Sequence, residues 1–180
     1  MQLITPRLLI RNLASADLGP LAAMWADPAV TRHLGGPRDP QEVRAVLARE
    51  AERPESSPLG LWPVEERRTG EVIGHCGLVE KDINGKREVE LVYVFTRWCW
   101  GRGYGTEAAA AIRDYGLGEL RLPRLVALIP PENSASAQVA RRVGMRRVDS
   151  VRRPDGRMLD LYALERCRRD RERGTNGVAA

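Results

Sequence analysis

Cysteine is scarce in this sequence, and long apolar runs are missing. The three cysteines, Cys76, Cys99 and Cys167, form no Cys-x-x-Cys pair and are odd in number, so we expect neither a disulfide framework nor a metal site. No window of about 18 uncharged apolar residues occurs, and the charged N-terminal segment lacks the apolar core of a signal peptide. We therefore expect a soluble, cytoplasmic protein with reduced thiols and no membrane association.

Aromatic residues are also few, at 5% of the 180 residues, whereas the net charge is +5. A nucleic-acid binder needs a clustered basic face with stacking aromatic rings, but much of the positive excess lies in arginines near the C-terminus. The sequence therefore does not favour a nucleic-acid partner. We expect one compact domain at residues 1–166, followed by a charged, disordered tail at 167–180.

Hydrophobic periodicity predicts a mixed α+β domain with about seven strands. The Asn84-Gly85 pair is a strong hairpin signal, so the middle strands should form an antiparallel meander. Ser15 and Asp39 are the expected N-caps of two early helices. The expected elements are a strand at 8–13, helices at 15–25 and from 39, strands at 59–66, 71–79 and 87–95, a helix ending near 117, a strand at 124–129, a helix at 134–143 and two strands flanking 153–156.

Three alternate glycines, Gly101, Gly103 and Gly105, lie between a strand-like run and an Ala-rich helical run. Glycine lets the backbone approach a ligand closely, and the following helix presents free N–H groups and its positive dipole end. The loop therefore predicts an anion site, suited to a diphosphate. No Gly-Lys-Ser/Thr follows, so a nucleotide triphosphatase is not supported. The next strand ends in two prolines where a dinucleotide-binding fold has an acidic residue, which disfavours a Rossmann fold. A tight turn without a ligand is the alternative.

Six short motifs follow one another between residues 3 and 164. They are ITPRLLIR at 4–11, DPAVTRHL at 27–34, GEVIGHCGL at 70–78, VELVY at 89–93, WGRGYGTEA at 100–108, and a segment at 133–145 that begins NSAS and ends VGM. Each motif is weak alone. In this order they resemble the GNAT N-acetyltransferases and, within them, the RimJ/RimL-like branch.

The resemblance implies a GNAT fold, in which a mostly antiparallel central sheet is flanked by helices. The strands at 87–95 and 124–129 would splay apart to form a cleft for acetyl-CoA. The backbone of Val94 and Phe95 would pair with the pantetheine arm. The loop would hold the diphosphate through the N–H groups of Gly101, Arg102, Gly103, Tyr104, Gly105 and Thr106.

Two further residues near this cleft are implied by the resemblance. Trp100 takes the first loop position, where the wider family usually has Gln or Arg, so its side chain cannot form an ion pair with a phosphate. Asn133 would order the cofactor or the helix that follows it.

Acetyl transfer to an amine requires a neutral amine, donors that face the developing oxyanion, and a proton for the departing thiolate. Many relatives supply that proton from a tyrosine, but the matching position here is Ala140. The Asn-x-x-Ser pattern of the branch implies Ser136 in its place. The alternative is that Asn133 and Ser136 only cap the helix.

Two residues are candidates for the general base. Glu90 lies in the middle of a central strand, where a carboxylate must contact water in a cleft or have a partner. His75 lies on the adjacent strand and has a suitable free pKa. The alternatives are an ion pair with arginine for Glu90 and an ordinary hydrogen bond for His75. A lysine ε-amine costs about 4.6 kcal/mol to deprotonate at pH 7 and an α-amine only about 1 to 1.4, so an α-amine needs little help.

The early helices line the acceptor side in this family, so the resemblance implies that Trp25, His33 and Leu34 contact the acceptor. The leading hypothesis is an acetyl-CoA-dependent N-acetyltransferase that works by direct attack in a ternary complex, as a monomer or homodimer. The branch suggests a protein N-terminal α-amine as acceptor. The alternatives are a small-molecule amine, such as an amino acid, polyamine or aminoglycoside, and a non-catalytic acetyl-CoA sensor.

Overall fold

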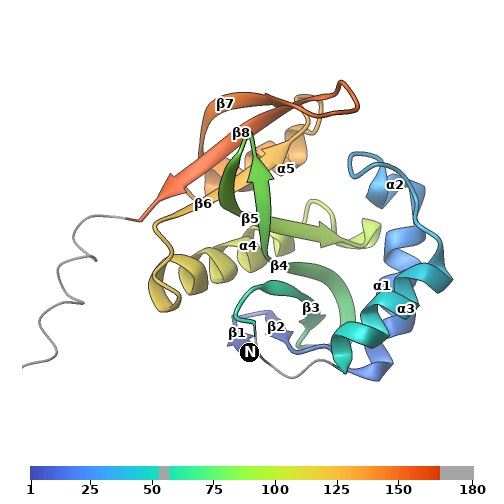
Figure 1. Ribbon diagram of the computed structural model, residues 1–180. Helices are drawn as coiled ribbons and strands as arrows, with labels where there is room; N and C mark the ends of the chain where they lie inside the picture. Colours follow the sequence, from blue (N-terminus) through green and yellow to red (C-terminus); the bar gives the residue numbers. More distant parts are fainter. Residues whose placement is uncertain (53–56, 167–180) are drawn as a thin grey trace, which may run out of the picture.

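One mixed sheet organises the chain, as the ribbon of the computed structural model shows (Figure 1). The structure describes residues 1–52 and 57–166, so the expected tail at 167–180 lies outside the described residues. Within them the sheet has eight strands in the order β1-β2-β3-β4-β5-β6-β8-β7. Neighbouring strands are antiparallel except for β5 and β6, which are parallel. The prediction of an α+β fold with a mostly antiparallel sheet is confirmed.

The strands and helices follow the expected order with two additions. The strands are β1 Gln2–Ile4, β2 Leu8–Arg11, β3 Gly60–Glu66, β4 Glu71–Ile83, β5 Lys86–Phe95, β6 Arg124–Ile129, β7 Arg146–Arg152 and β8 Met158–Glu165. The helices are α1 Leu18–Ala26, α2 Pro28–Thr31, α3 Pro40–Ala51, α4 Tyr104–Asp114 and α5 Ser134–Arg142. The additions are β1 and α2, which the sequence analysis did not predict.

The two expected helix caps had different outcomes. Asp39 caps α3 as predicted, since its Oδ1 accepts hydrogen bonds from the N–H groups of Gln41 and Glu42. The prediction for Ser15 is wrong, because residues Ser15–Asp17 form a 3₁₀ turn and α1 begins after it. The side chain that closes this turn is Asp17, whose Oδ2 accepts from Ala14 N at 2.7 Å.

The hairpin between β4 and β5 is confirmed at the predicted residues. Asn84 and Gly85 both have positive φ angles, 53° and 77°, which is the geometry of a two-residue type I′ turn. The turn fixes the register of the two longest strands, so that His75 lies opposite Val94 and Val79 opposite Glu90. This register decides which β5 side chains face each side of the sheet.

Helices cover both faces of the sheet (Figure 1). Helices α4 and α5 pack on one face through a cluster that includes Ile112, Ala140 and, from β5, Phe95. Helices α1 and α3 pack on the other face through a cluster that includes Leu21 and Val94. Side chains alternate along a strand, so successive β5 residues serve opposite faces of the molecule.

Strand pairing in the sheet is shortest between β5 and β6. Within the described residues, the register of this parallel pair consists of Glu90 opposite Val126. Beyond this pair β5 continues for five residues to Phe95 and β6 for three to Ile129. The sheet is therefore open between these two strand ends, as the sequence analysis expected.

The contact between Gly77 of β4 and β3 gives a test of the fold. A Cβ atom at Gly77 would overlap the carbonyl oxygen of Gly60, and a backbone atom in a central strand cannot move aside. We expect Gly77→Ala to lower the free energy of unfolding in urea by about 3 kcal/mol.

The matched control is Gly60→Ala in the neighbouring strand, where an added Cβ meets nothing within 4 Å. This variant should change the unfolding free energy by less than about 0.5 kcal/mol. Equal losses in the two variants would contradict the assigned β3–β4 contact.

Candidate functional site

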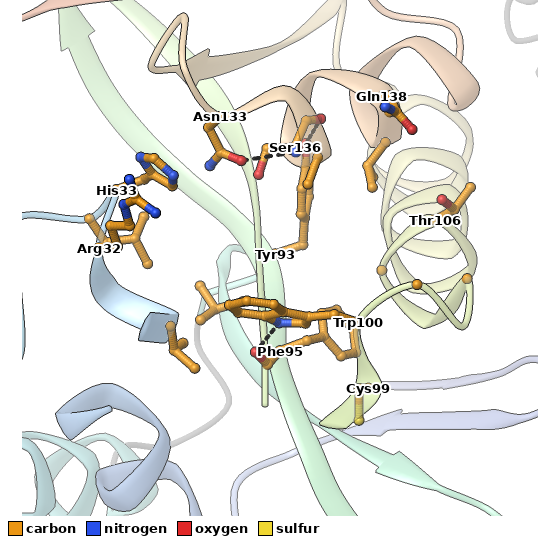
Figure 2. A pocket seen from close by; sticks show the side chains of 18 of the residues that line it. Arg32, His33, Tyr93, Phe95, Cys99, Trp100, Thr106, Asn133, Ser136 and Gln138 are labelled. Atoms are coloured by element: carbon orange, nitrogen blue, oxygen red, sulfur yellow. Dashed lines mark hydrogen bonds between the residues drawn. The ribbon is translucent and has the colours of Figure 1, made fainter. Parts of the chain in front are cut away.

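A cavity of about 420 Å³ lies at the open end of β5, beside the N-termini of α4 and α5 (Figure 2). Its walls come from four segments: α2 and the residues after it, the end of β5, the glycine loop and the first turns of α5. The lining residues are Ala29, Val30, Arg32, His33, Leu34, Tyr93, Val94, Phe95, Cys99, Trp100, Gly101, Gly103, Gly105, Thr106, Asn133, Ala135, Ser136, Gln138, Val139 and Arg142. Most of the residues predicted from the sequence are thus brought together.

The glycine loop ends in the N-terminus of α4. Gly101 and Gly103 have φ angles of 75° and 81°, in the left-handed region that side chains with a Cβ disfavour. The backbone bond from Glu107 N to Gly103 O spans 3.1 Å and closes the first helical turn. The N–H groups before Glu107 have no carbonyl one turn earlier in the helix, so they are available to an anion.

Gly105 differs from the other two glycines. It has no positive φ, and an added Cβ would make ordinary 3.8 Å contacts with the Phe95 ring and Val139. The sequence analysis treated the three glycines alike, but only Gly101 and Gly103 are required by the backbone conformation of the loop.

Trp100 connects the loop to the end of β5. Its indole Nε1 donates to Phe95 O at 2.9 Å, and about half of the residue is exposed, 52%. Thr96 N donates to Ile73 O on β4, so the Phe95 carbonyl, on the other side of the same peptide, faces away from β4. Figure 2 shows the indole lying across the end of β5. Phe95 therefore presents its backbone carbonyl to the cavity, where the Trp100 indole is hydrogen-bonded to it.

The first turn of α5 is held by two side chains that line the cavity. Asn133 Oδ1 accepts from Ser136 N at 3.1 Å, which caps the helix. Tyr93 donates its hydroxyl to Ser136 O at 2.8 Å from β5 below (Figure 2). The capping alternative thus holds for Asn133, whereas Ser136 is the residue that is capped and its own side chain lines the cavity.

Tyr93 is a site residue that the sequence analysis missed. Burial raises the pKa of its hydroxyl, so the phenol is neutral at physiological pH and its proton is held by the Ser136 carbonyl. Strand alternation could have found it, because Tyr93 and Phe95 necessarily share one face of β5.

Glu90 lies at the point where β5 and β6 part. Its side chain is 14% exposed, its Oε1 accepts from Leu128 N at 3.3 Å, and its Oε2 lies 4.0 Å from Lys81 Nζ. Leu128 is on β6 beyond the last paired residue, so the carboxylate replaces a missing strand partner. Burial raises the pKa of Glu90. Glu90 lies behind the cavity and is not among its lining residues.

The buried His75 pairs with the half-buried Trp25, and neither residue lines the cavity. His75 is only 3% exposed, and its Nδ1 accepts the indole N–H of Trp25 at 3.3 Å. Burial lowers the pKa of His75 to about 4, so the imidazole is neutral at pH 7. The expectation that Trp25 contacts the acceptor directly does not fit this geometry, since its ring packs between His75 and Arg38.

The other two expected acceptor residues, His33 and Leu34, do line the cavity. His33 Nδ1 lies 3.8 Å from Glu132 Oε1, which joins the segment after α2 to the segment before α5. Leu34 is 39% exposed. These residues belong to the loop after α2. The Asp27-Pro28 pair at the start of α2 is the same capping signal as Asp39-Pro40, but the sequence analysis did not use it to predict a helix.

Two predicted loop residues direct their side chains elsewhere. The Tyr104 hydroxyl donates to Glu66 Oε1 at 2.6 Å in the core. The Arg102 guanidinium lies over the rings of Trp98 and Tyr104, at 5.9 Å and 5.8 Å. Neither residue is among those that line the cavity, and Arg102 N donates to Cys99 O at 3.4 Å.

Neither a metal group nor a membrane helix is found in the part of the chain that the structure describes. No cluster of three or more His, Cys, Asp or Glu side chains there could hold a metal ion. No helix there is both long and apolar enough to span a bilayer.

Comparison with known proteins identifies the family. Residues 7–146 match the acetyltransferase (GNAT) domain. The chain belongs to the GNAT acetyltransferase family. As a GNAT acetyltransferase it is expected to take its acetyl group from acetyl-CoA, and the free N–H groups of the loop fit the diphosphate of that donor.

Similar proteins cover nearly the whole of this GNAT acetyltransferase. The uncharacterized protein YkkB of Bacillus subtilis is 34% identical over 153 residues, which are 84% of this chain and 89% of that one. A crystal structure of an acetyltransferase from Agrobacterium tumefaciens has a TM-score of 0.77 and 32% identity, covering 92% and 94%. RimL, a ribosomal L7/L12 alpha-N-protein acetyltransferase in complex with coenzyme A, has a TM-score of 0.74 at 14% identity, covering 91% and 96%, and shares the fold.

The buried neutral His75 makes stability depend on pH. The unfolded chain gains a proton on this histidine below about pH 6.5, whereas the folded protein does so only near pH 4. The stabilisation is therefore present above pH 6.5 and is lost as the pH falls through this window. We expect urea unfolding to show that His75→Gln loses about 2 kcal/mol less than the parent protein between pH 7 and pH 4.5. Parallel pH profiles for the two proteins would contradict the assigned burial.

Proposed function

We propose that this protein transfers acetyl from acetyl-CoA directly to the α-amine of a protein N-terminus, within a ternary complex. The observation that carries the proposal is the composition of the cavity. Among the described residues that line it there is no carboxylate, although one continuous space joins the glycine loop to the segment after α2. Such a site suits an amine that loses its proton easily.

The acceptor argument rests on the cost of making the amine neutral. An α-amine with a pKa near 8 is about one-tenth neutral at pH 7, whereas a lysine side chain needs about 4.6 kcal/mol. A lysine acceptor would need a base in contact with it. Glu90 and His75 both lie behind the cavity wall, which favours the α-amine. RimL, which shares this fold, is an alpha-N-protein acetyltransferase and supports the same acceptor class.

The donor is proposed to bind along the loop and the end of β5. The N–H groups at the start of α4 hold its diphosphate, as helix N-termini commonly do. The backbone of Val94 and Phe95 receives its pantetheine arm, and the Phe95 carbonyl becomes available when the indole of Trp100 releases it. Thr106 and Asn133 line the space between these two parts.

The proton movements are assigned to two residues. The Ser136 hydroxyl, at the capped start of α5, gives its proton to the departing thiolate, and the proton taken from the amine returns to Ser136 through water. Glu90 takes the proton of the incoming amine through water, because its carboxylate lies at the parting of β5 and β6 and not in the cavity. We assign His75 and Trp25 to supporting the wall, and His33 and Leu34 to contacting the acceptor.

The acceptor class can be tested with a panel of amines. We expect acetyl-CoA to release free CoA thiol with peptides that have a free N-terminus, and mass spectrometry to place the acetyl group on the α-amine. The matched control is the same peptide with a blocked N-terminus and an internal lysine, which should not react.

Two other outcomes would replace this proposal. Acetylation of amino acids, polyamines or aminoglycosides in place of peptides would make the protein a small-molecule acetyltransferase. A higher melting temperature with acetyl-CoA, but no thiol release with any amine, would make it an acetyl-CoA sensor.

Two variants test the proton assignments. Glu90→Gln should lower kcat about tenfold for an α-amine at pH 7 and much less above pH 8, where the amine is already neutral. Ser136→Ala should lower kcat about tenfold at every pH, while the KM for acetyl-CoA changes little. A pH-independent effect of Glu90→Gln, or an unchanged kcat in Ser136→Ala, would remove the corresponding assignment.

A further inference from the structure

A segment close to the N-terminus is bonded to the glycine loop and the first turn of α4. Residues Thr5 and Arg7 lie between β1 and β2, about one hundred positions before Glu107 in the sequence, as the separations of 102 and 100 show. The motif that contains them was one of the six that pointed to the family. Neither Thr5 nor Arg7 lines the cavity, so the proposed function gives this motif no role.

The Glu107 carboxylate is bound by this segment through both oxygens. Oε1 accepts from Thr5 Oγ1 at 2.6 Å and from Arg7 N at 2.9 Å. Oε2 accepts from Arg7 Nε at 2.6 Å. The Glu107 side chain is 17% exposed, so this is a partly buried ion pair with charge-assisted bonds in short geometry.

The same arginine also contacts the loop. Arg7 Nη1 donates to Arg102 O at 2.8 Å, and its guanidinium lies 4.4 Å from the centre of the Tyr104 ring. A Cβ on Gly103 would come within 3.4 Å of Arg7 Nη2. One guanidinium thus contacts Arg102 and Tyr104 and lies beside Gly103, while it also binds Glu107 in the first turn of the following helix.

The charge of Glu107 gives this contact an electrostatic consequence. The N-terminus of a helix attracts anions through about half a positive charge, but a carboxylate in the first turn opposes a second anion there. A bare Glu107 would therefore weaken the attraction for a diphosphate. The ion pair with Arg7 cancels that charge, although Arg7 itself does not line the cavity.

We propose that Arg7 and Glu107 form a clamp that holds the glycine loop in its anion-binding conformation, with Arg7 as a positioning residue for the donor diphosphate. The inference rests on the proposed binding of acetyl-CoA at this loop. Thr5 completes the clamp as a second donor to the carboxylate. The clamp joins the motif at 4–11 to the motif at 100–108.

The test compares a donor that has a diphosphate with one that lacks it. Arg7→Gln should raise the KM for acetyl-CoA, and the Kd for CoA measured by calorimetry, about tenfold. The kcat should stay within about twofold, and kcat/KM with S-acetylpantetheine, which has no phosphate, should not change.

Three further variants separate charge from geometry. Arg7→Lys keeps the charge but cannot bind the Arg102 carbonyl and Glu107 in the same fork, so its KM should be intermediate. The double variant Arg7→Gln with Glu107→Gln should bind CoA more tightly than Arg7→Gln alone, because the uncompensated carboxylate is gone. The matched control is Arg87→Gln, which breaks an exposed pair with Glu80 on the β4–β5 hairpin and should leave all constants unchanged.

The outcomes distinguish the clamp from the proposed function. An unchanged Kd for CoA in Arg7→Gln, or an equal loss with acetyl-CoA and S-acetylpantetheine, would overturn the clamp. Absence of CoA binding by the parent protein would instead overturn the proposed function. If circular dichroism shows that Arg7→Gln does not fold, Arg7→Lys and Glu107→Gln decide the question by the same comparison of the two donors.

Discussion

The parting of β5 from β6 is the constraint on which the rest of the site depends. A parallel pair that is joined at Glu90 and Val126 leaves backbone on both strand ends without a strand partner. Unpaired backbone groups must find other partners, and this molecule supplies them from side chains. The Glu90 carboxylate takes Leu128 N–H, and the Trp100 indole takes the Phe95 carbonyl. The opening is thus a gap in the sheet where backbone groups are hydrogen-bonded to side chains and not to a neighbouring strand.

The two sides of the opening are built differently. On the loop side, the conformation of the wall depends on the positive φ angles of Gly101 and Gly103. On the α2 side, the walls include side chains such as His33 and Leu34, whereas Trp25 and the buried His75 bond to each other and do not line the cavity. A fold can support different functions through local changes of side chains, and the α2 side is the part of this cavity that is built from them.

Contacts between distant segments hold the functional residues in place. The Tyr93 hydroxyl reaches from β5 to the backbone of Ser136 on α5, and Arg7 reaches from the start of the chain to Glu107 on α4. Each contact gives a hydrogen-bond partner to a polar group that would otherwise be removed from water without one. The start of α5 and the glycine loop with the start of α4 are therefore each held by a side chain from a segment distant in the sequence.

The sequence by itself determined the local features. Asp39 before Pro40, the Asn84-Gly85 turn and the alternation of the middle strands predicted their elements because turn and cap geometry depends on a few adjacent residues. The glycine loop was located for the same reason, whereas the Asn133-Ser136 pair came from the resemblance to the RimJ/RimL-like branch. Ser15 was misjudged because a neighbouring carboxylate, Asp17, supplied the better acceptor.

Tertiary structure alone decided which of these residues share the cavity. Periodicity places His75 and Glu90 on strands. It does not show that His75 is hydrogen-bonded to Trp25, or that Glu90 is hydrogen-bonded to Leu128 on β6. Nor can it show that Thr5 and Arg7 meet Glu107, because that contact joins residues about one hundred positions apart. Local patterns fix local backbone, whereas burial and long-range pairing follow from how the helices close over the two faces of the sheet.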